Sequence, residues 1–167
     1  MSRSLVAALL VAVFSSGCGS KAFADISGSV DGIKLAAEAS YWGGPFVVFT
    51  DKPFECMDMY WVKRGQNFET GVEAPVTEDM VALLFTYEAS AVEAGDVVLG
   101  GTSPVDARLL VVKNEALTVY RADDGNIDVT EVSEDDGAIG SFTTVFDEGS
   151  LEGDFQVDWC TNLKSKY

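Results

Sequence analysis

The closing stretch of the chain, Gly137 to Cys160, constrains the fold more than any other part of the sequence. It reads GAIGSFTTVFDEGSLEGDFQVDWC, and from Ser141 onward apolar and polar residues tend to alternate with a period of two. That period is typical of a β-strand with one buried face. The turn-forming residues Asp147-Glu148-Gly149-Ser150 divide the stretch, so we expect two antiparallel strands joined by a four-residue loop.

This loop length predicts a register for the hairpin. Phe146 then lies opposite Leu151, Phe142 opposite Phe155, and Thr144 opposite Gly153, which places the apolar side chains on one face. We expect that face to be core. The other face, with Ser141, Thr143, Glu152, Asp154, Gln156 and Asp158, is expected to be exposed to water.

The rest of the chain from Asp25 onward also predicts strands, because apolar residues recur at short spacing and turn residues interrupt them. The expected strands are Ala24–Val30, Ile33–Trp42, Pro45–Thr50, Met57–Lys63, Met80–Tyr87, Asp96–Leu99, Ala107–Val112, Ala116–Arg121 and Ile127–Val132. The first two are expected to form a hairpin at Asp31-Gly32. The predicted fold class is all-β, an antiparallel β-sandwich of about 8–10 strands, with a closed lipocalin-like β-barrel as the alternative.

The first 17 residues, MSRSLVAALLVAVFSSG, have the build of a secretory signal peptide: one cation, a short apolar run and small residues. The run of about ten apolar residues is shorter than the roughly 20 that a transmembrane helix needs. We therefore predict a signal peptide over 1–17, a lipidated tether over 18–24, a β-domain over 25–160 and a tail over 161–167.

Ser16-Gly17-Cys18 resembles the lipobox of bacterial lipoproteins, in which the cysteine is acylated and becomes the first residue. The resemblance implies that Cys18 anchors the chain to a lipid bilayer, and Gly19 after it implies the outer membrane. The alternative is ordinary signal cleavage after Ala22-Phe23-Ala24, which gives a soluble periplasmic or secreted protein that begins at Asp25.

Two cysteines remain in the domain, Cys56 and Cys160, and an exported chain with two spare cysteines usually pairs them. Such a bridge closes a loop of about 100 residues, which contributes up to roughly 4–5 kcal/mol on the chain-entropy model. A bridge between the two sheets would suit a sandwich, so this pairing favours that fold over a barrel. Thiol catalysis is disfavoured because the sequence contains no histidine to activate a thiolate.

The charge balance excludes some partners. The chain has 27 acidic and 11 basic residues and a formal net charge of −16, which repels nucleic acids. The acidic stretches 123–128 and 134–137 lack the alternating ligand pattern of a calcium loop, so no metal is predicted. No cofactor is predicted either.

Adjacent aromatic residues are the best sequence candidates for a binding face. The pairs are Tyr41-Trp42 and Tyr60-Trp61, and because neighbours on a strand point to opposite sides, one ring of each pair is expected to reach the surface. We predict that Trp42, Tyr60 and Trp61 contribute to any binding face. The predicted function is a non-catalytic binding or structural module at the cell envelope, with an envelope protein or a glycan as partner. The alternative is a β-barrel carrier of a lipid or other hydrophobic ligand, and the third hypothesis is a carboxylate-dependent hydrolase.

The whole pattern resembles a type of small, uncharacterised bacterial lipoprotein domain. The shared features are the lipobox, a glycine-rich opening strand (Ser27-Gly28-Ser29-Val30-Asp31-Gly32), a mid-chain cysteine and the hairpin G-x-F-x-x-x-F-x-x-G-x-L-x-G-x-F before a last cysteine. In this chain that hairpin runs from Gly140 to Phe155, with Cys160 after it. The resemblance implies a β-sandwich-like domain and no particular activity.

Overall fold

The computed structural model describes residues 22–52, 55–56, 78–89, 91–133 and 137–160, and these ranges form an all-β domain. The predicted fold class is confirmed. The strands are β1 (Phe23–Val30), β2 (Ala39–Gly43), β3 (Phe46–Thr50), β4 (Met80–Tyr87), β5 (Gly95–Val98), β6 (Val105–Lys113), β7 (Ala116–Arg121), β8 (Asp124–Ser133), β9 (Gly137–Phe146) and β10 (Gly149–Trp159). Within the same ranges, no helix is long and apolar enough to cross a membrane.

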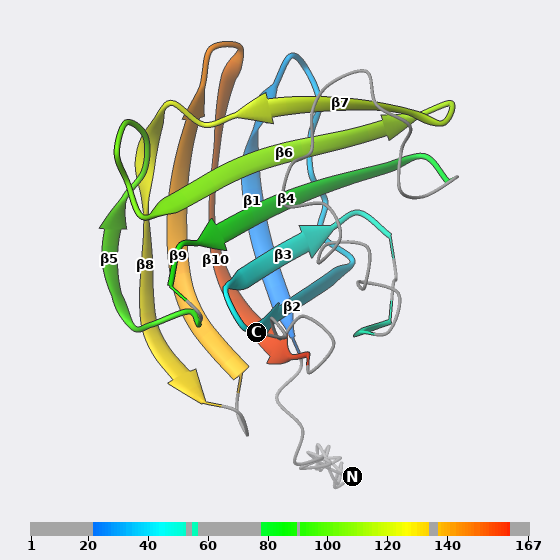
Figure 1. The fold of residues 1–167 in the computed structure, drawn as a ribbon. Coiled ribbons are helices and arrows are strands. Elements are labelled where there is room, and N and C mark those ends of the chain that lie inside the picture. Colours follow the sequence, from blue (N-terminus) through cyan, green and yellow to red (C-terminus); the bar gives the residue numbers. More distant parts are fainter. Residues whose placement is uncertain (1–21, 53–54, 57–77, 90, 134–136, 161–167) are drawn as a thin grey trace, which may run out of the picture.

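The strands belong to one strongly curled sheet whose two halves face each other (Figure 1). Sheet A contains β5, β8, β9, β10 and β1, and sheet B contains β2, β3, β4, β6 and β7, whose strands cross those of sheet A. The halves join where the end of β10 pairs in parallel with β2, Asp158 beside Tyr41 and Trp159 beside Trp42. A strand that passes from one layer to the other makes such a corner.

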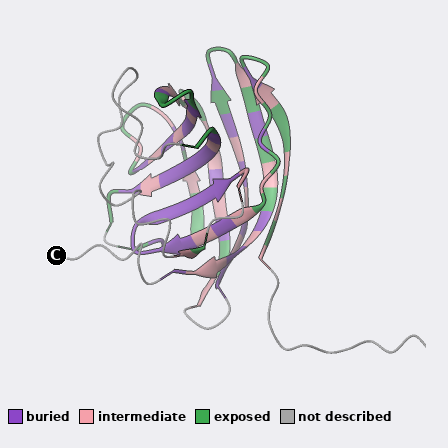
Figure 2. Cartoon of the chain, turned by 90° about the vertical axis from the view of Figure 1, so that its right-hand side faces the viewer, coloured by how far each residue is buried: buried purple, intermediate pink, exposed green. Residues whose placement is uncertain are grey.

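The core between the two halves is built around four phenylalanine rings. Phe49 and Phe85 come from sheet B, and Phe142 and Phe155 come from sheet A. The ring of Phe142 lies 5.6 Å from that of Phe49 and 5.2 Å from that of Phe85. Aromatic rings at these separations are in packing contact. Along the long strands of sheet A, residues that face this core alternate with residues that face water, and Figure 2 shows this alternation of buried and exposed positions.

The closing hairpin has a different register from the predicted one. Phe146 pairs with Gly149 rather than Leu151, so the loop is the two-residue turn Asp147-Glu148. Two-residue loops are the commonest hairpin connections, so the shorter loop is the usual outcome, although neither Asp147 nor Glu148 has the positive φ angle of a primed turn. A shift of two positions keeps every side chain on its predicted face.

The observed register places each central phenylalanine opposite a glycine. Phe155 lies opposite Gly140, and Phe142 opposite Gly153. A Cβ atom on Gly140 would lie closest to the carbonyl oxygen of Asp128 on β8 and 2.8 Å from Cζ of Phe155, so a side chain there would meet both the neighbouring backbone and that ring. The predicted pairing of Phe142 with Phe155 is therefore wrong.

The first predicted hairpin is only partly correct. Asp31 and Gly32 form the turn with positive φ angles of 51° and 74°, and Val30 pairs with Ile33. The chain then leaves sheet A, because Leu35 turns into the core with 3% of its surface exposed. Strand structure resumes only at Ala39 in β2. The expected strand Met57–Lys63 lies outside the described residues.

The predicted disulfide between Cys56 and Cys160 is confirmed. The sequence argument expected this bridge to connect the two halves of the sandwich, and it does not. Cys160 is fully buried in a second apolar cluster on the other face of sheet B, together with Phe46, Val48, Met80, Ala82, Leu84, Leu110, Val112 and Leu117. β3 and β4 thus carry apolar residues on both faces, which explains why β3 reads as a continuous apolar run rather than an alternating one.

Candidate functional site

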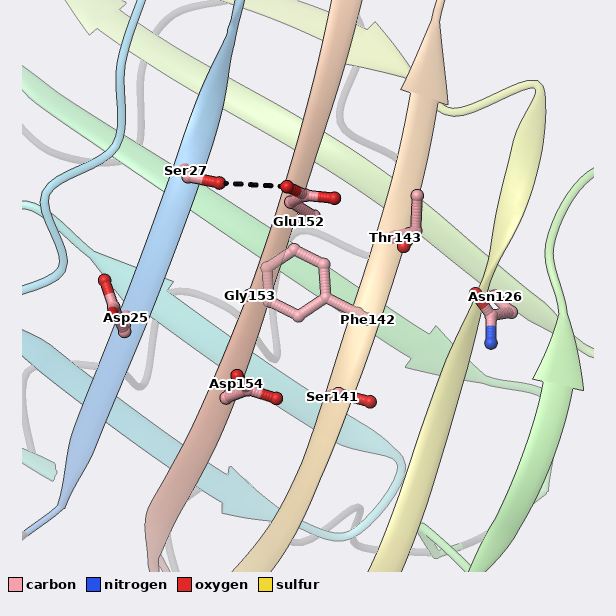
Figure 3. Close-up of a pocket in the computed structure, with 9 residues that line it drawn as sticks. All are labelled: Asp25, Ser27, Asn126, Ser141, Phe142, Thr143, Glu152, Gly153 and Asp154. Carbon is pink, nitrogen blue, oxygen red and sulfur yellow. Dashed lines mark hydrogen bonds between the residues drawn. The ribbon is translucent and has the colours of Figure 1, made fainter.

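A polar groove of about 370 Å³ lies on the outer face of sheet A and crosses β1, β10, β9 and β8 (Figure 3). Its walls carry carboxylate, hydroxyl and amide groups. The lining residues are Asp25, Ser27, Asn126, Ser141, Phe142, Thr143, Glu152, Gly153 and Asp154.

The strand register explains why these residues meet. Asp25 lies opposite Asp154, which lies opposite Ser141, and this row forms one wall. The other wall is the next row of outward-pointing residues, Ser27, Glu152, Thr143 and Asn126. Side chains two positions apart on a strand share a face, so the groove is the gap between two successive rows.

The floor of the groove is made by inward-pointing residues of the intervening row. In Figure 3 the ring of Phe142 lies over Gly153 of the neighbouring strand, where no side chain competes for the space. Phe142 is 3% exposed, and its ring belongs to the core behind the groove. Because core packing fixes these backbones, the walls stand on a rigid base.

The groove is negatively charged. Asp25, Glu152 and Asp154 are exposed, and none of the lining residues is basic. The Ser27 hydroxyl donates a hydrogen bond of 3.3 Å to Glu152 Oε1. Directly opposed like charges such as Asp25 and Asp154 destabilise an antiparallel pair. A cationic group bound between them would remove that repulsion.

The same face continues beyond the groove. Asp128 lies opposite Ser141 on β8, and Asp96 lies opposite Asp128 on the edge strand β5. Asn126 Nδ2 donates a 3.0 Å hydrogen bond to Asp96 Oδ1. Four strand pairings thus carry one largely acidic row across the whole width of sheet A.

The predicted aromatic residues do not form this site. Trp42 is 4% exposed and packs in the core against Trp159, with ring centroids 4.4 Å apart, so it cannot present its ring to a partner. It lies on β2 beside the β10 corner, and tryptophan side chains are highly buried on average. Tyr60 and Trp61 lie outside the described residues, as does Cys18.

A second depression lies near the start of β1. Its lining includes Phe23, which is 51% exposed, and the acidic side chains of Glu38, Glu55 and Asp158. Partial burial raises the pKa of Asp158 above its usual value, because a charged carboxylate loses hydration there.

The sequence predicts part of the groove. The alternation of apolar and polar residues in the closing hairpin places the groove residues of β9 and β10, including Thr143 and Glu152, on a face exposed to water. The contribution of Asp25, Ser27 and Asn126 depends on β1 and β8 packing beside that hairpin, and local patterns do not encode such long-range pairing.

A scan against models of protein families, a search of curated proteins and a search of solved structures found no match to this chain.

Proposed function

We propose that this chain is a non-catalytic binding module of the cell envelope, anchored through an acylated Cys18, which holds a basic protein partner on the outer face of sheet A. The observation that carries the proposal is the polar groove, with three exposed carboxylates and no basic lining residue. Lysine and arginine side chains complement such a surface in charge and in hydrogen bonding.

The packing of the interior favours a binding module over a carrier. A carrier needs an internal cavity, typically of roughly 300 Å³ or more. Here the rings of Phe49, Phe85, Phe142 and Phe155 occupy the space between the halves, and Phe49 and Phe155 have centroids 5.4 Å apart. The groove is instead an open surface feature.

The exposure of the groove favours binding over hydrolysis. Carboxylate catalysis relies on one acid whose pKa is raised by an apolar or enclosed setting while its partner stays ionised. Asp25, Glu152 and Asp154 are exposed on an open face. The hydroxyl and amide groups beside these carboxylates can form further hydrogen bonds to a bound partner.

The position of β1 supports the lipid anchor. Phe23 and Ala24 are already part of β1, where they pair with Gln156 and Phe155. Cleavage after Ala24 would remove both residues from the strand. Cleavage before Cys18 leaves β1 whole and places four residues between the acylated cysteine and the strand, a reach of at most about 15 Å at roughly 3.5 Å per residue.

The test measures binding of a short basic peptide, tetralysine, by calorimetry and by amide shifts of the isotope-labelled protein. We expect shifts to centre on Ser141, Thr143 and Glu152. The double variant Glu152→Gln and Asp154→Asn should weaken binding about twofold to thirtyfold, since each exposed ion pair contributes roughly 0.2–1 kcal/mol.

The matched control removes two charges elsewhere, through Glu115→Gln and Asp123→Asn, both exposed and outside the groove. It changes the net charge by the same amount, so it should alter affinity less than twofold. Equal weakening by both double variants would show that only overall charge attracts the peptide, and the proposed site would be wrong.

A further inference from the structure

Among the described residues, one edge of β1 has backbone groups that pair with no other strand. The two-residue turn makes Phe146 and Gly149 a hydrogen-bonded pair, so along β10 the backbone groups of Gly149 and every second residue after it point toward β9. The backbone N–H and C=O groups of the residues between them, including Glu152 and Asp154, point toward β1. Their partners Ser27 and Asp25 therefore use their backbone groups within the sheet.

The backbone N–H and C=O groups of the other residues of β1 consequently point away from β10. Val30 confirms this direction, since its N–H and C=O both bond to Ile33, at 3.0 and 2.8 Å, on the far side from β10. Ala24, Ile26 and Gly28 share that orientation by the two-residue period. Within the described part of the chain, β1 pairs with no strand on that side.

A largely apolar groove of about 460 Å³ borders this free edge. It is lined by Ile26–Ser29 of β1 and by Lys34–Ala36. Leu35 is buried, whereas Ala36 is exposed. The chain after Ile33 diverges from β1 instead of pairing with it, and this divergence opens the groove.

The two faces of β1 define what an added strand must carry. On the outer face, Asp25 and Ser27 belong to the acidic groove, so side chains of the added strand beside them would be basic. On the inner face, Ile26 packs against the core, so the facing side chains would be apolar. A second copy of this chain is disfavoured, because each copy has a formal net charge of −16.

We infer that the free edge of β1 binds an extended peptide segment of the partner, one that alternates basic and apolar residues, as an additional strand of sheet A. Backbone hydrogen bonds to Ala24, Ile26 and Gly28 would provide affinity, and the alternating side chains would provide specificity. This inference rests on the proposed function, and it specifies how the partner is held.

The probe is a synthetic octapeptide of alternating lysine and valine, tested on the purified native protein by calorimetry and by amide hydrogen exchange. We expect slower exchange at Ile26 and Gly28 on binding. A peptide of the same composition with four lysines followed by four valines carries the same charge without the alternation, and should bind at least tenfold more weakly.

Two variants test the edge directly. Ala36→Trp fills the groove from its exposed side and should weaken binding at least tenfold, whereas Ala94→Trp, at an exposed position outside this groove, should not. Ala24→Pro removes an N–H that points away from the sheet, so the fold should persist while binding falls.

The outcomes separate the two proposals. If the alternating peptide perturbs Ser141 and Thr143 without slowing exchange at Ile26 and Gly28, or if Ala36→Trp and Ala94→Trp behave alike, strand addition is refuted and the groove remains the site. If neither this peptide nor tetralysine perturbs the groove, both proposals fail.

Discussion

Replacing Gly153 with alanine tests how closely β1 packs against β10. The new Cβ atom would lie 2.5 Å from the Asp25 carbonyl oxygen and 3.2 Å from Ile26 Cα. Both are backbone atoms of β1, so no side-chain rotation relieves the contact. Carbon–oxygen contacts in sheets rarely fall below about 3.3 Å, so β1 would have to move by nearly 1 Å.

The expected cost of Gly153→Ala is about 1–3 kcal/mol in the free energy of unfolding, the usual range for overpacking. Gly153 has no positive φ, so the cost is steric and not conformational. For a chain of this size each kcal/mol lowers Tm by roughly 2–4 °C, which predicts a fall of about 2–12 °C in calorimetry. Amide exchange at Asp25 and Ser27, which bond to β10, should also become faster.

Gly101→Ala is the matched control. Gly101 has a φ of +59°, yet nothing lies within 4 Å of its added Cβ atom. Its cost of about 1 kcal/mol would come from backbone strain alone, and exchange in β1 should not change. If Gly153→Ala melts at the temperature of the unmodified protein and keeps its β1 amides protected, β1 does not pack closely against Gly153 of β10.

Three further changes test the core and the charges. Replacing Cys56 and Cys160 with serine opens a loop with a sequence separation of 104 and should cost up to about 4–5 kcal/mol in urea unfolding; a loss under about 1 kcal/mol would contradict this. The buried Tyr87 hydroxyl has no hydrogen-bond partner in the described structure, so Tyr87→Phe should leave the unfolding free energy unchanged or raise it by about 1 kcal/mol; a clear loss would reveal a partner. Burial raises the pKa of Asp158 above 3.8, so its charged form opposes folding, and the destabilisation develops as pH rises through the raised pKa. Asp158→Asn should therefore raise the urea midpoint at pH 7 but not at pH 3, and an equal gain at both pH values would exclude this cause.

The sequence predicted those features of the fold that depend on local alternation. β4 and β7 have the bounds that the pattern gave, Met80–Tyr87 and Ala116–Arg121. The face of each residue in the closing hairpin was also predicted, since side-chain direction follows a period of two whichever turn connects the strands. The number of residues in that turn was not predicted correctly, because Asp147, Glu148 and Gly149 are compatible with turns of two residues as well as four.

The remaining errors have a common physical source, which is contact between segments far apart in the chain. The ring of Trp42 would suit an exposed binding face, but it is buried in the main core, where the end of β10 brings Trp159 against it. The predicted position of the disulfide failed for the same reason. Sheet B buries apolar residues on both of its faces, and Cys160 lies in the cluster on its outer side. The local sequence pattern does not show that a second buried face exists.

β10 connects these observations, because its successive residues serve different parts of the molecule. Glu152 and Asp154 point outward into the groove, Phe155 and Val157 point into the main core, and Cys160, the residue after the strand, enters the second cluster. The strand also holds β1 on one side, with the free edge of β1 beyond it. A displacement of β10 would therefore alter the core, the charged groove and the proposed strand-addition edge together. A partner bound at the groove and the edge should accordingly slow amide exchange along β10 as well as β1, whereas attraction by surface charge alone would leave β10 unchanged.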